Sequence, residues 1–227
     1  MNRTTVSLTS LVLGAALVLS GCGAKPENTT PAASNEPTNS ASDGTQGGGA
    51  KSWDKAPDMT IDTSKTYKAV VKTSEGEFTI RLFPKEAPKT VNSFVFLSKQ
   101  GFYEGVIFHR IIKDFMIQTG DPTGTGGGGP GYSIPDELNN GYKYDKYTVA
   151  MANAGPNTGG SQFFIGTGAS VKDLDRIPNY TIFGEVESGK EVVDKIAATP
   201  VDMDNTGREQ SKPKVEVKME SVTIEEG

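Results

Sequence analysis

Residues 108–121 read FHRIIKDFMIQTGD, and residues 151–165 read MANAGPNTGGSQFFI. Both stretches are rich in residues that favour β-strands, yet each carries polar side chains among the apolar ones. Because alternate residues of a strand share one face, Arg110 lies on the same face as Phe108 and Ile112. An arginine stays protonated and offers five N–H donors. The two stretches therefore predict a cationic hydrogen-bond donor beside an apolar slot built from strands.

The residues around these stretches alternate between short β-rich runs and two helical patterns. In the first helical pattern, Pro88 stands near the start and Gly101 just past the end, and in the second, Pro200 follows the end. Many short strands with two helices predict a mainly β fold, a closed or nearly closed barrel with helices over its open ends. The expected helices are Ala87–Gln100 and Gly189–Ala198, and the expected strands are Tyr67–Thr73, Glu77–Phe83, Val106–Ile111, Phe115–Gly120, Tyr147–Met151, Gln162–Thr167, Thr181–Val186 and Lys214–Ile224.

A glycine-rich segment, residues 124–131, reads GTGGGGPG and lies between the expected strands. A phosphate-binding P-loop would need Lys and then Ser or Thr after the glycines, whereas Pro130 follows them here. The interpretation that fits is a surface loop whose backbone takes conformations open to glycine.

The rarest residues exclude several kinds of site. Cys22 is the only cysteine, so this sequence holds no intrachain disulfide, no CxxC redox pair and no cysteine-rich zinc site. His109 is the only histidine, which excludes a multi-histidine metal site. The net charge is −5 and no basic stripe is present, which argues against nucleic-acid binding.

The N-terminal residues predict export and anchoring. Arg3 precedes a mainly apolar run from Leu8 to Leu19, about twelve residues where a spanning helix needs ~20, which is typical of a signal peptide. The run ends in Leu-Ser-Gly-Cys, which resembles the bacterial lipobox and implies cleavage before Cys22 and diacylglycerol on its sulfur. A free buried cysteine is the alternative interpretation. Two acyl chains would give stable anchoring at the extracytoplasmic face of a bacterial cell membrane.

The composition divides the chain into three parts. Residues 1–21 are the expected signal peptide, and residues 60–227 are the expected folded domain. Residues 22–59 carry the lipidated cysteine and a Pro/Ser/Thr/Gly-rich tether, whose few apolar residues cannot offset the entropy of ordering it. Trp53, the only tryptophan, falls in or near this tether and is not expected to report on the core of the domain.

The two stretches quoted first resemble the signature segments of the cyclophilins, a family of peptidyl-prolyl cis-trans isomerases, and the resemblance extends over about Thr66–Ile224. It implies a closed, eight-stranded antiparallel β-barrel capped by two α-helices, acting without a cofactor or metal on proline-containing polypeptides. By the resemblance, Arg110 is the catalytic arginine, the pocket for the proline ring takes Phe115, Met116, Phe164 and Leu174, and the residues that hold the substrate backbone are Gln118, Ala152, Asn153 and Gln162. Of these, Arg110, Phe115 and Gln118 form the catalytic group.

Two positions depart from many cyclophilins. Asp173 stands where many carry a tryptophan before the pocket leucine, and this implies weak inhibition by cyclosporin. Tyr180 stands where many carry a histidine on the pocket rim, and its ring can still pack on a proline ring. We therefore include Tyr180 among the substrate-binding residues and expect activity to survive both changes.

Each site residue also has a structural interpretation. Arg110 could belong to a structural ion pair, Phe115 and Phe164 to the core, and Gln162 to a strand edge. His109 alternates away from Arg110, which favours a structural histidine, and no GxSxG context supports hydrolysis by His109 with Ser161. At the level of the whole protein, the alternatives to an isomerase for exported proteins are a proline-binding module and a surface adhesin. A monomer is the default expectation.

Overall fold

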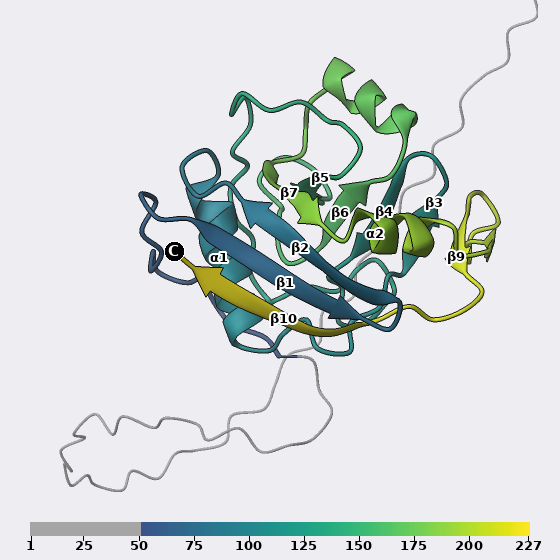
Figure 1. Cartoon of the computed structure of the whole chain (residues 1–227), viewed down its shortest axis with the longest axis horizontal. Coiled ribbons are helices and arrows are strands. Elements are labelled where there is room, and N and C mark those ends of the chain that lie inside the picture. The colour runs from purple at the N-terminus through teal and green to yellow at the C-terminus, as the bar shows by residue number, and fades with distance from the viewer. Residues whose placement is uncertain (1–50) are drawn as a thin grey trace, which may run out of the picture. The chain divides into compact units, whose positions relative to one another are not determined.

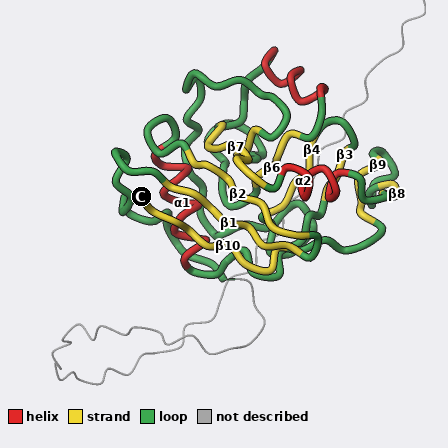
Figure 2. Tube along the Cα trace, in the orientation of Figure 1, coloured by secondary structure: helices red, strands yellow, loops and turns green. Residues whose placement is uncertain are grey.

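The computed structural model describes residues 51–227, so the expected signal peptide, Cys22 and most of the expected tether lie outside the described residues. The described part is built on one eight-stranded antiparallel sheet (Figures 1 and 2). Its strands follow one another in the order β10 (Met219–Glu226), β1 (Tyr67–Thr73), β2 (Gly76–Leu82), β7 (Ile182–Ser188), β5 (Thr148–Met151), β6 (Phe163–Gly166), β4 (Met116–Thr119) and β3 (Arg110–Ile112).

The prediction of a closed barrel is wrong: the sheet curls, but its ladder stays open between the edge strands β3 and β10. The chain just before β3 meets the start of β10 only in a short stretch, through the bridge between Ile107 and Lys218 and a few backbone hydrogen bonds beside it, such as the one from the Met219 N–H to the Val106 carbonyl. The strands that form in these regions, β3 with 3 residues and β10 with 8, are shorter than the expected ranges Val106–Ile111 and Lys214–Ile224. β3 also lies close to β9 (Gln210–Pro213), a strand outside the eight-stranded sheet.

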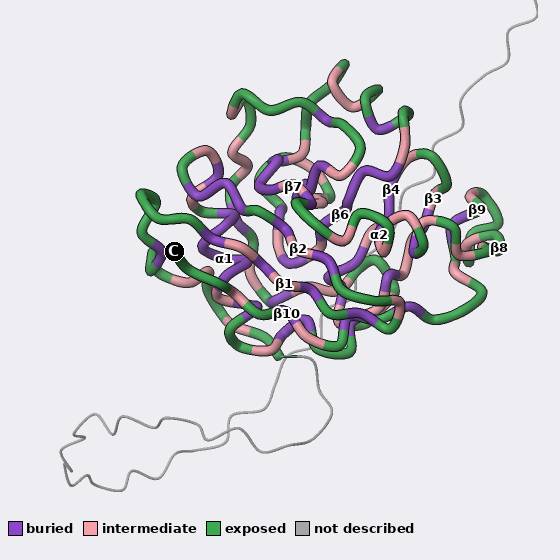
Figure 3. Tube along the Cα trace, viewed as in Figure 1, coloured by how far each residue is buried: buried purple, intermediate pink, exposed green. Residues whose placement is uncertain are grey.

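The core lies inside the curl, where alternate residues of the strands point. In β1, Tyr67, Ala69 and Val71 are buried while the residues between them are partly exposed, and Figure 3 colours the tube by this burial. Phe94 of helix α1 (Pro88–Lys99) meets Phe163 edge to face at 5.5 Å. Each such side chain contributes about 1.5–3 kcal/mol through its removal from water.

Helix α1 has no capping side chain of its own at its N-terminus. The carboxylate of Glu137, far along the chain, accepts the backbone N–H groups of Lys89 and Thr90 at 3.0 and 2.9 Å, and the hydroxyl of Thr90 at 2.8 Å. A carboxylate at this end satisfies free N–H groups and complements the helix dipole. The contact ties the loop that carries Glu137 to the rigid helix.

Three elements were not expected from the sequence. They are the 3₁₀ helix η1 (Ala169–Arg176) and the strands of a small hairpin, β8 (Val201–Met203) and β9. The second expected helix forms as α2 (Lys190–Ala197), packed on β2 and β4. Within residues 51–227, no helix is both long enough and apolar enough to cross a membrane.

The expectation for Trp53 is wrong. Its ring packs edge to face on Phe96 at 5.2 Å and lies 5.9 Å from Phe102, and it joins the rim of the main core. Its backbone N–H also donates to the carbonyl of Pro130 at 2.9 Å. Residues 51–59, which the composition assigned to the tether, therefore include a segment that packs on the domain, and the Asn92 amide, which donates to the carbonyls of Pro57 and Asp58, adds to this contact.

Candidate active site

The predicted site residues come together through the register of three neighbouring strands. Arg110 on β3 lies opposite Gln118 on β4, and Gln118 lies opposite Phe164 on β6. Residues that are directly paired across antiparallel strands present their side chains on the same face. The ladder thus builds a row of one cation, one amide and one aromatic ring across the curled sheet.

A cavity of about 210 Å³ opens over this row. Nine of the ten residues predicted for catalysis or substrate binding line it. They are Arg110, Phe115, Met116, Gln118, Ala152, Asn153, Phe164, Leu174 and Tyr180. The tenth, Gln162, lies in the adjoining groove of about 600 Å³, which Gln118, Ala152 and Asn153 also line.

The floor and one wall of the cavity are apolar and held firmly. Met116 is 1% exposed and Phe164 5% exposed, and both belong to a second hydrophobic cluster separate from the main core. The ring of Tyr180 meets Phe164 edge to face at 5.3 Å. The Tyr144 hydroxyl donates to the carbonyl of Tyr180 at 2.6 Å and accepts its N–H at 2.9 Å, which fixes the rim.

A chain of side-chain hydrogen bonds runs along the polar wall. Arg110 Nη1 donates to Gln118 Oε1 at 3.2 Å, and Gln118 Nε2 donates to Gln162 Oε1 at 3.0 Å. Gln162 Nε2 in turn donates to the carbonyls of Gly126 and Gly128 at 3.0 and 2.9 Å. These contacts orient both glutamine amides, so their positions are set before a ligand arrives.

The glycine-rich loop is organised by a buried carboxylate. Asp121 Oδ2 accepts the backbone N–H groups of Thr125, Gly126 and Gly128. Burial alone would raise the pKa of Asp121, but the hydrogen bonds from Thr123 and from the glycine amides outweigh it and lower the pKa to about 2. These amides are engaged by the protein's own anion, which agrees with a structural loop rather than a phosphate site.

Gly128 is a position of this loop at which glycine is required. A Cβ on Gly128 would meet the carboxylate of Asp121 and the hydroxyl of Thr123. Residue 128 must therefore lack a side chain for its N–H to reach Asp121 while its carbonyl receives Gln162.

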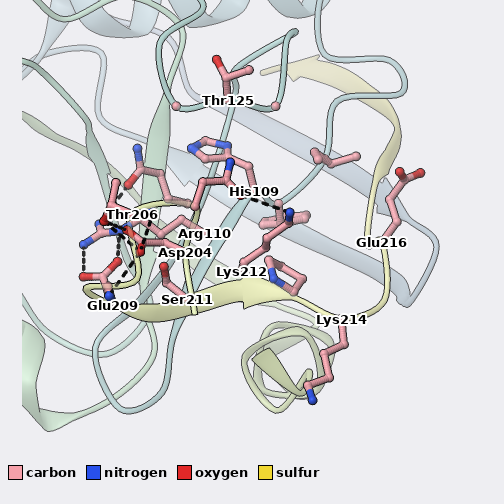
Figure 4. A pocket seen from close by; sticks show the side chains of 17 residues that line it. His109, Arg110, Thr125, Asp204, Thr206, Glu209, Ser211, Lys212, Lys214 and Glu216 are labelled. Carbon is pink, nitrogen blue, oxygen red and sulfur yellow. Dashed lines mark hydrogen bonds and ion pairs between the residues drawn. The ribbon is translucent and has the colours of Figure 1, made fainter. Parts of the chain in front are cut away.

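Glu209, on the loop between β8 and β9, is a site residue that the sequence did not reveal. Its carboxylate accepts Nε of Arg110 at 2.7 Å and Nη2 at 2.8 Å, as the dashed lines in Figure 4 show. The hydrogen bond from Arg110 lowers the pKa of Glu209. A carboxylate in a polar loop belongs to no periodic sequence pattern. The pairing of Glu209 with Arg110 is therefore seen only in the folded structure.

His109 and Ser161 do not form a catalytic pair. The Ser161 hydroxyl donates to the carbonyl of Gly120 at 2.7 Å, and Ser161 is 1% exposed. Neither ring nitrogen of His109 has a hydrogen-bond partner among residues 51–227, and burial lowers the pKa of the ring. The same part of the chain holds no cluster of three or more His, Cys, Asp or Glu that could bind a metal ion.

These features define what the site can do. The apolar cavity has room for a small ring, the oriented amides offer hydrogen-bond donors and acceptors, and a guanidinium stands at the edge. The site presents no activated nucleophile, so it suits binding and electrostatic stabilisation rather than covalent chemistry.

Comparisons with known proteins agree with this geometry. The family model described as cyclophilin type peptidyl-prolyl cis-trans isomerase matches residues 68–224. Peptidyl-prolyl cis-trans isomerase B of Streptomyces anulatus is 43% identical over 175 residues, covering 69% of this chain and 95% of that protein. The mouse peptidylprolyl isomerase domain and WD repeat-containing protein 1 is 47% identical over 160 residues, but the matched region is only 24% of that protein.

A solved structure shares the fold. The cyclophilin type isomerase of Cryptosporidium parvum, crystallised in the presence of the dipeptide Ala-Pro, has a TM-score of 0.62 and 37% sequence identity, covering 70% of this chain and 98% of that one. The family match, the relatives, the curled eight-stranded sheet and the lined cavity lead to one conclusion: this chain belongs to the cyclophilin-type peptidyl-prolyl cis-trans isomerases, a family of enzymes.

Proposed function

We propose that this chain accelerates rotation about X-Pro peptide bonds, with the proline ring in the 210 Å³ cavity and Arg110 as the hydrogen-bond donor to the twisted bond. The observation that carries the proposal concerns the lining of this cavity. Arg110 and Gln118 line it together with the buried ring of Phe164 and the buried thioether of Met116. The cavity therefore offers a ring-sized apolar surface and a cationic donor side by side.

The chemistry explains why these residue types suffice. Peptide-bond rotation faces a barrier of ~18–20 kcal/mol because resonance is lost in the twisted state. In that state the prolyl nitrogen regains a localised lone pair, which can accept an N–H bond from Arg110. No covalent bond breaks, so the reaction asks only that the twisted state be bound more tightly than the planar ones.

The required stabilisation exceeds what one contact provides. An acceleration of about 10⁵-fold corresponds to about 7 kcal/mol. One charge-assisted hydrogen bond contributes about 1.5–3 kcal/mol. In this proposal the rest comes from fixing the proline ring on Phe164 and Met116 and the flanking backbone on Gln118, Asn153 and Gln162.

We further propose that the substrates are exported proteins at the cell surface. The support is the N-terminal sequence, in which an apolar run ends in Leu-Ser-Gly-Cys with Cys22 as the acceptor of the lipid. A tethered isomerase at the membrane would meet newly exported chains, whose X-Pro bonds isomerise in tens to hundreds of seconds without help.

The catalytic proposal is tested with the full chain carrying Cys22→Ser, which removes the lipid acceptor. Exchange NMR on a short Ala-Pro peptide should show cis–trans exchange far above the uncatalysed rate. Arg110→Lys keeps the charge but loses the planar fork, so the rate should fall at least tenfold. Arg176→Lys is the matched control, since Arg176 is exposed and lies outside the cavity. If the chain with Arg110 intact binds the peptide but does not accelerate its cis–trans exchange, the protein is instead a proline-binding module.

The location is tested by fractionating bacterial cells that express the complete chain. The chain should sediment with membranes and label with a fatty-acid analogue, and Cys22→Ser should abolish the labelling. Equal membrane association and labelling of both forms would contradict lipid anchoring through Cys22.

A further inference from the structure

The guanidinium of Arg110 forms an ion pair with the carboxylate of Glu209 without any substrate. The two side chains meet fork to fork, Nε to Oε2 and Nη2 to Oε1, and each is 35% exposed. Arg110 Nη1 makes the third contact, to Gln118. An arginine has five N–H bonds, so one on Nη1 and one on Nη2 stay free for a ligand.

The loop that presents Glu209 is shaped independently of Arg110. Asp204 Oδ1 accepts the backbone N–H groups of Thr206 at 3.1 Å and of Arg208 at 2.9 Å, and the Asp204 N–H donates to the carbonyl of Glu209 at 2.7 Å. A turn closed on its own carboxylate holds its shape through local contacts. The loop thus holds Glu209 beside Arg110, as Figure 4 shows.

We propose that Glu209 is a positioning residue for the isomerisation: it fixes the Arg110 guanidinium in one orientation at the edge of the proline cavity before the substrate binds. This inference rests on the proposed role of Arg110. A long arginine side chain loses rotamer freedom when it is held against a ligand. Because the contact with Glu209 already restricts the Arg110 side chain, this entropy cost does not arise when the substrate binds. A donor already aimed at the developing lone pair also needs no reorganisation during the reaction.

The geometry favours positioning over blocking. While paired with Glu209, Arg110 still lines the cavity together with Gln118 and Phe164. Its Nη1 contact to Gln118 joins it to the polar wall instead of drawing it away. The pair takes up part of the cation's charge, but at 35% exposure that charge is already screened by water. Removing Glu209 should therefore lower activity.

The test uses the full chain carrying Cys22→Ser and exchange NMR over a range of Ala-Pro peptide concentrations, so that kcat and KM are obtained separately. Glu209→Ala should lower kcat about tenfold with KM changed less than twofold. Glu209→Gln, which keeps one acceptor, should fall between it and the wild type. Glu216→Ala is the matched control, because Glu216 lines the same cleft as Glu209 and has no part in the contacts of Arg110.

Two further measurements separate positioning from a structural role. In the Arg110→Ala background, Glu209→Ala should have no additional effect on kcat, because Glu209 acts only through Arg110. The Nε–H signal of Arg110 in ¹H–¹⁵N spectra should be protected from exchange with water in the wild type and lose that protection in Glu209→Ala.

The outcomes are distinct. Unchanged or increased kcat in Glu209→Ala, or a full tenfold loss that persists without Arg110, would overturn the inference. An unprotected Nε–H signal in the wild type would overturn it as well. Absent acceleration by the wild type would refute the proposed function instead, while the Nε–H signal would still report on the Arg110–Glu209 pair.

Discussion

Asp121 should stabilise the domain by an amount that depends on pH. Its pKa is lowered from the ordinary value of 3.8 to about 2, because hydrogen bonds from Thr123, Gly126 and Gly128 outweigh the opposing effect of burial. At 1.36 kcal/mol per pKa unit, this corresponds to about 2 kcal/mol of folding free energy. Asp121 is 1% exposed, but most of the loop around it faces water, so this figure is an upper bound.

The sign follows from the direction of the pKa change. A carboxyl whose pKa is lower in the folded than in the unfolded state contributes stability above its unfolded pKa and loses it as the pH falls through the folded pKa. The contribution of Asp121 should be fully present at pH 7 and should disappear between about pH 4 and pH 2. Because Asp121 organises the loop that receives Gln162, the same change should loosen the polar wall of the site.

The measurement is urea unfolding followed by circular dichroism, comparing the wild type with Asp121→Asn. We expect Asp121→Asn to lower the free energy of unfolding by about 2 kcal/mol at pH 7, and the difference to shrink towards zero near pH 2. Asp54→Asn, at an exposed aspartate, should change stability by less than about 0.5 kcal/mol. Equal stabilities at pH 7, or a difference that persists at pH 2, would refute the reasoning.

Three further changes probe the loop, the cavity floor and the N-terminal segment. Gly128→Ala should lower the free energy of unfolding in urea by about 1–3 kcal/mol and slow isomerisation, because the new Cβ would meet Asp121. Gly129 has open space around it, so Gly129→Ala should be neutral. Equal effects of the two substitutions would contradict this account of the loop. Phe164→Ala should lower stability by about 3 kcal/mol and raise KM for an Ala-Pro peptide, and an unchanged KM would place the proline ring elsewhere. Trp53→Ala should lower the free energy of unfolding by about 1–3 kcal/mol, since Trp53 packs on two aromatic rings, and no change would show that its segment adds nothing to the domain.

Much of the fold was predictable from local patterns. The expected strand Tyr67–Thr73 has the bounds that β1 takes, and helix α1 differs from its expected range by one residue at each end. Alternation and helix-end signals are properties of consecutive residues, so they can be read from the chain. Closure of the barrel is different, because it depends on whether two strands far apart in sequence extend far enough to pair. Here only a short stretch around Ile107 and Lys218 does so.

The site divides in the same way. The residues that line the cavity lie in two stretches whose sequence is distinctive, and nine of the ten predicted positions meet there. Glu209 and the packing of Trp53 gave no such signal. Glu209 and Trp53 are each a single side chain in a polar segment, and the residue that each contacts lies tens of residues away along the chain.

The central claim is that Arg110 is the group on which isomerisation depends. The most direct test is the cis-to-trans rate of a short Ala-Pro peptide by exchange NMR, measured with the unlipidated full chain and with the same chain carrying Arg110→Ala. The loss of one aligned donor in a preorganised site predicts a fall of at least about 10²-fold, with the fold intact by circular dichroism. A folded Arg110→Ala protein that keeps a rate within threefold of the wild type would contradict the account.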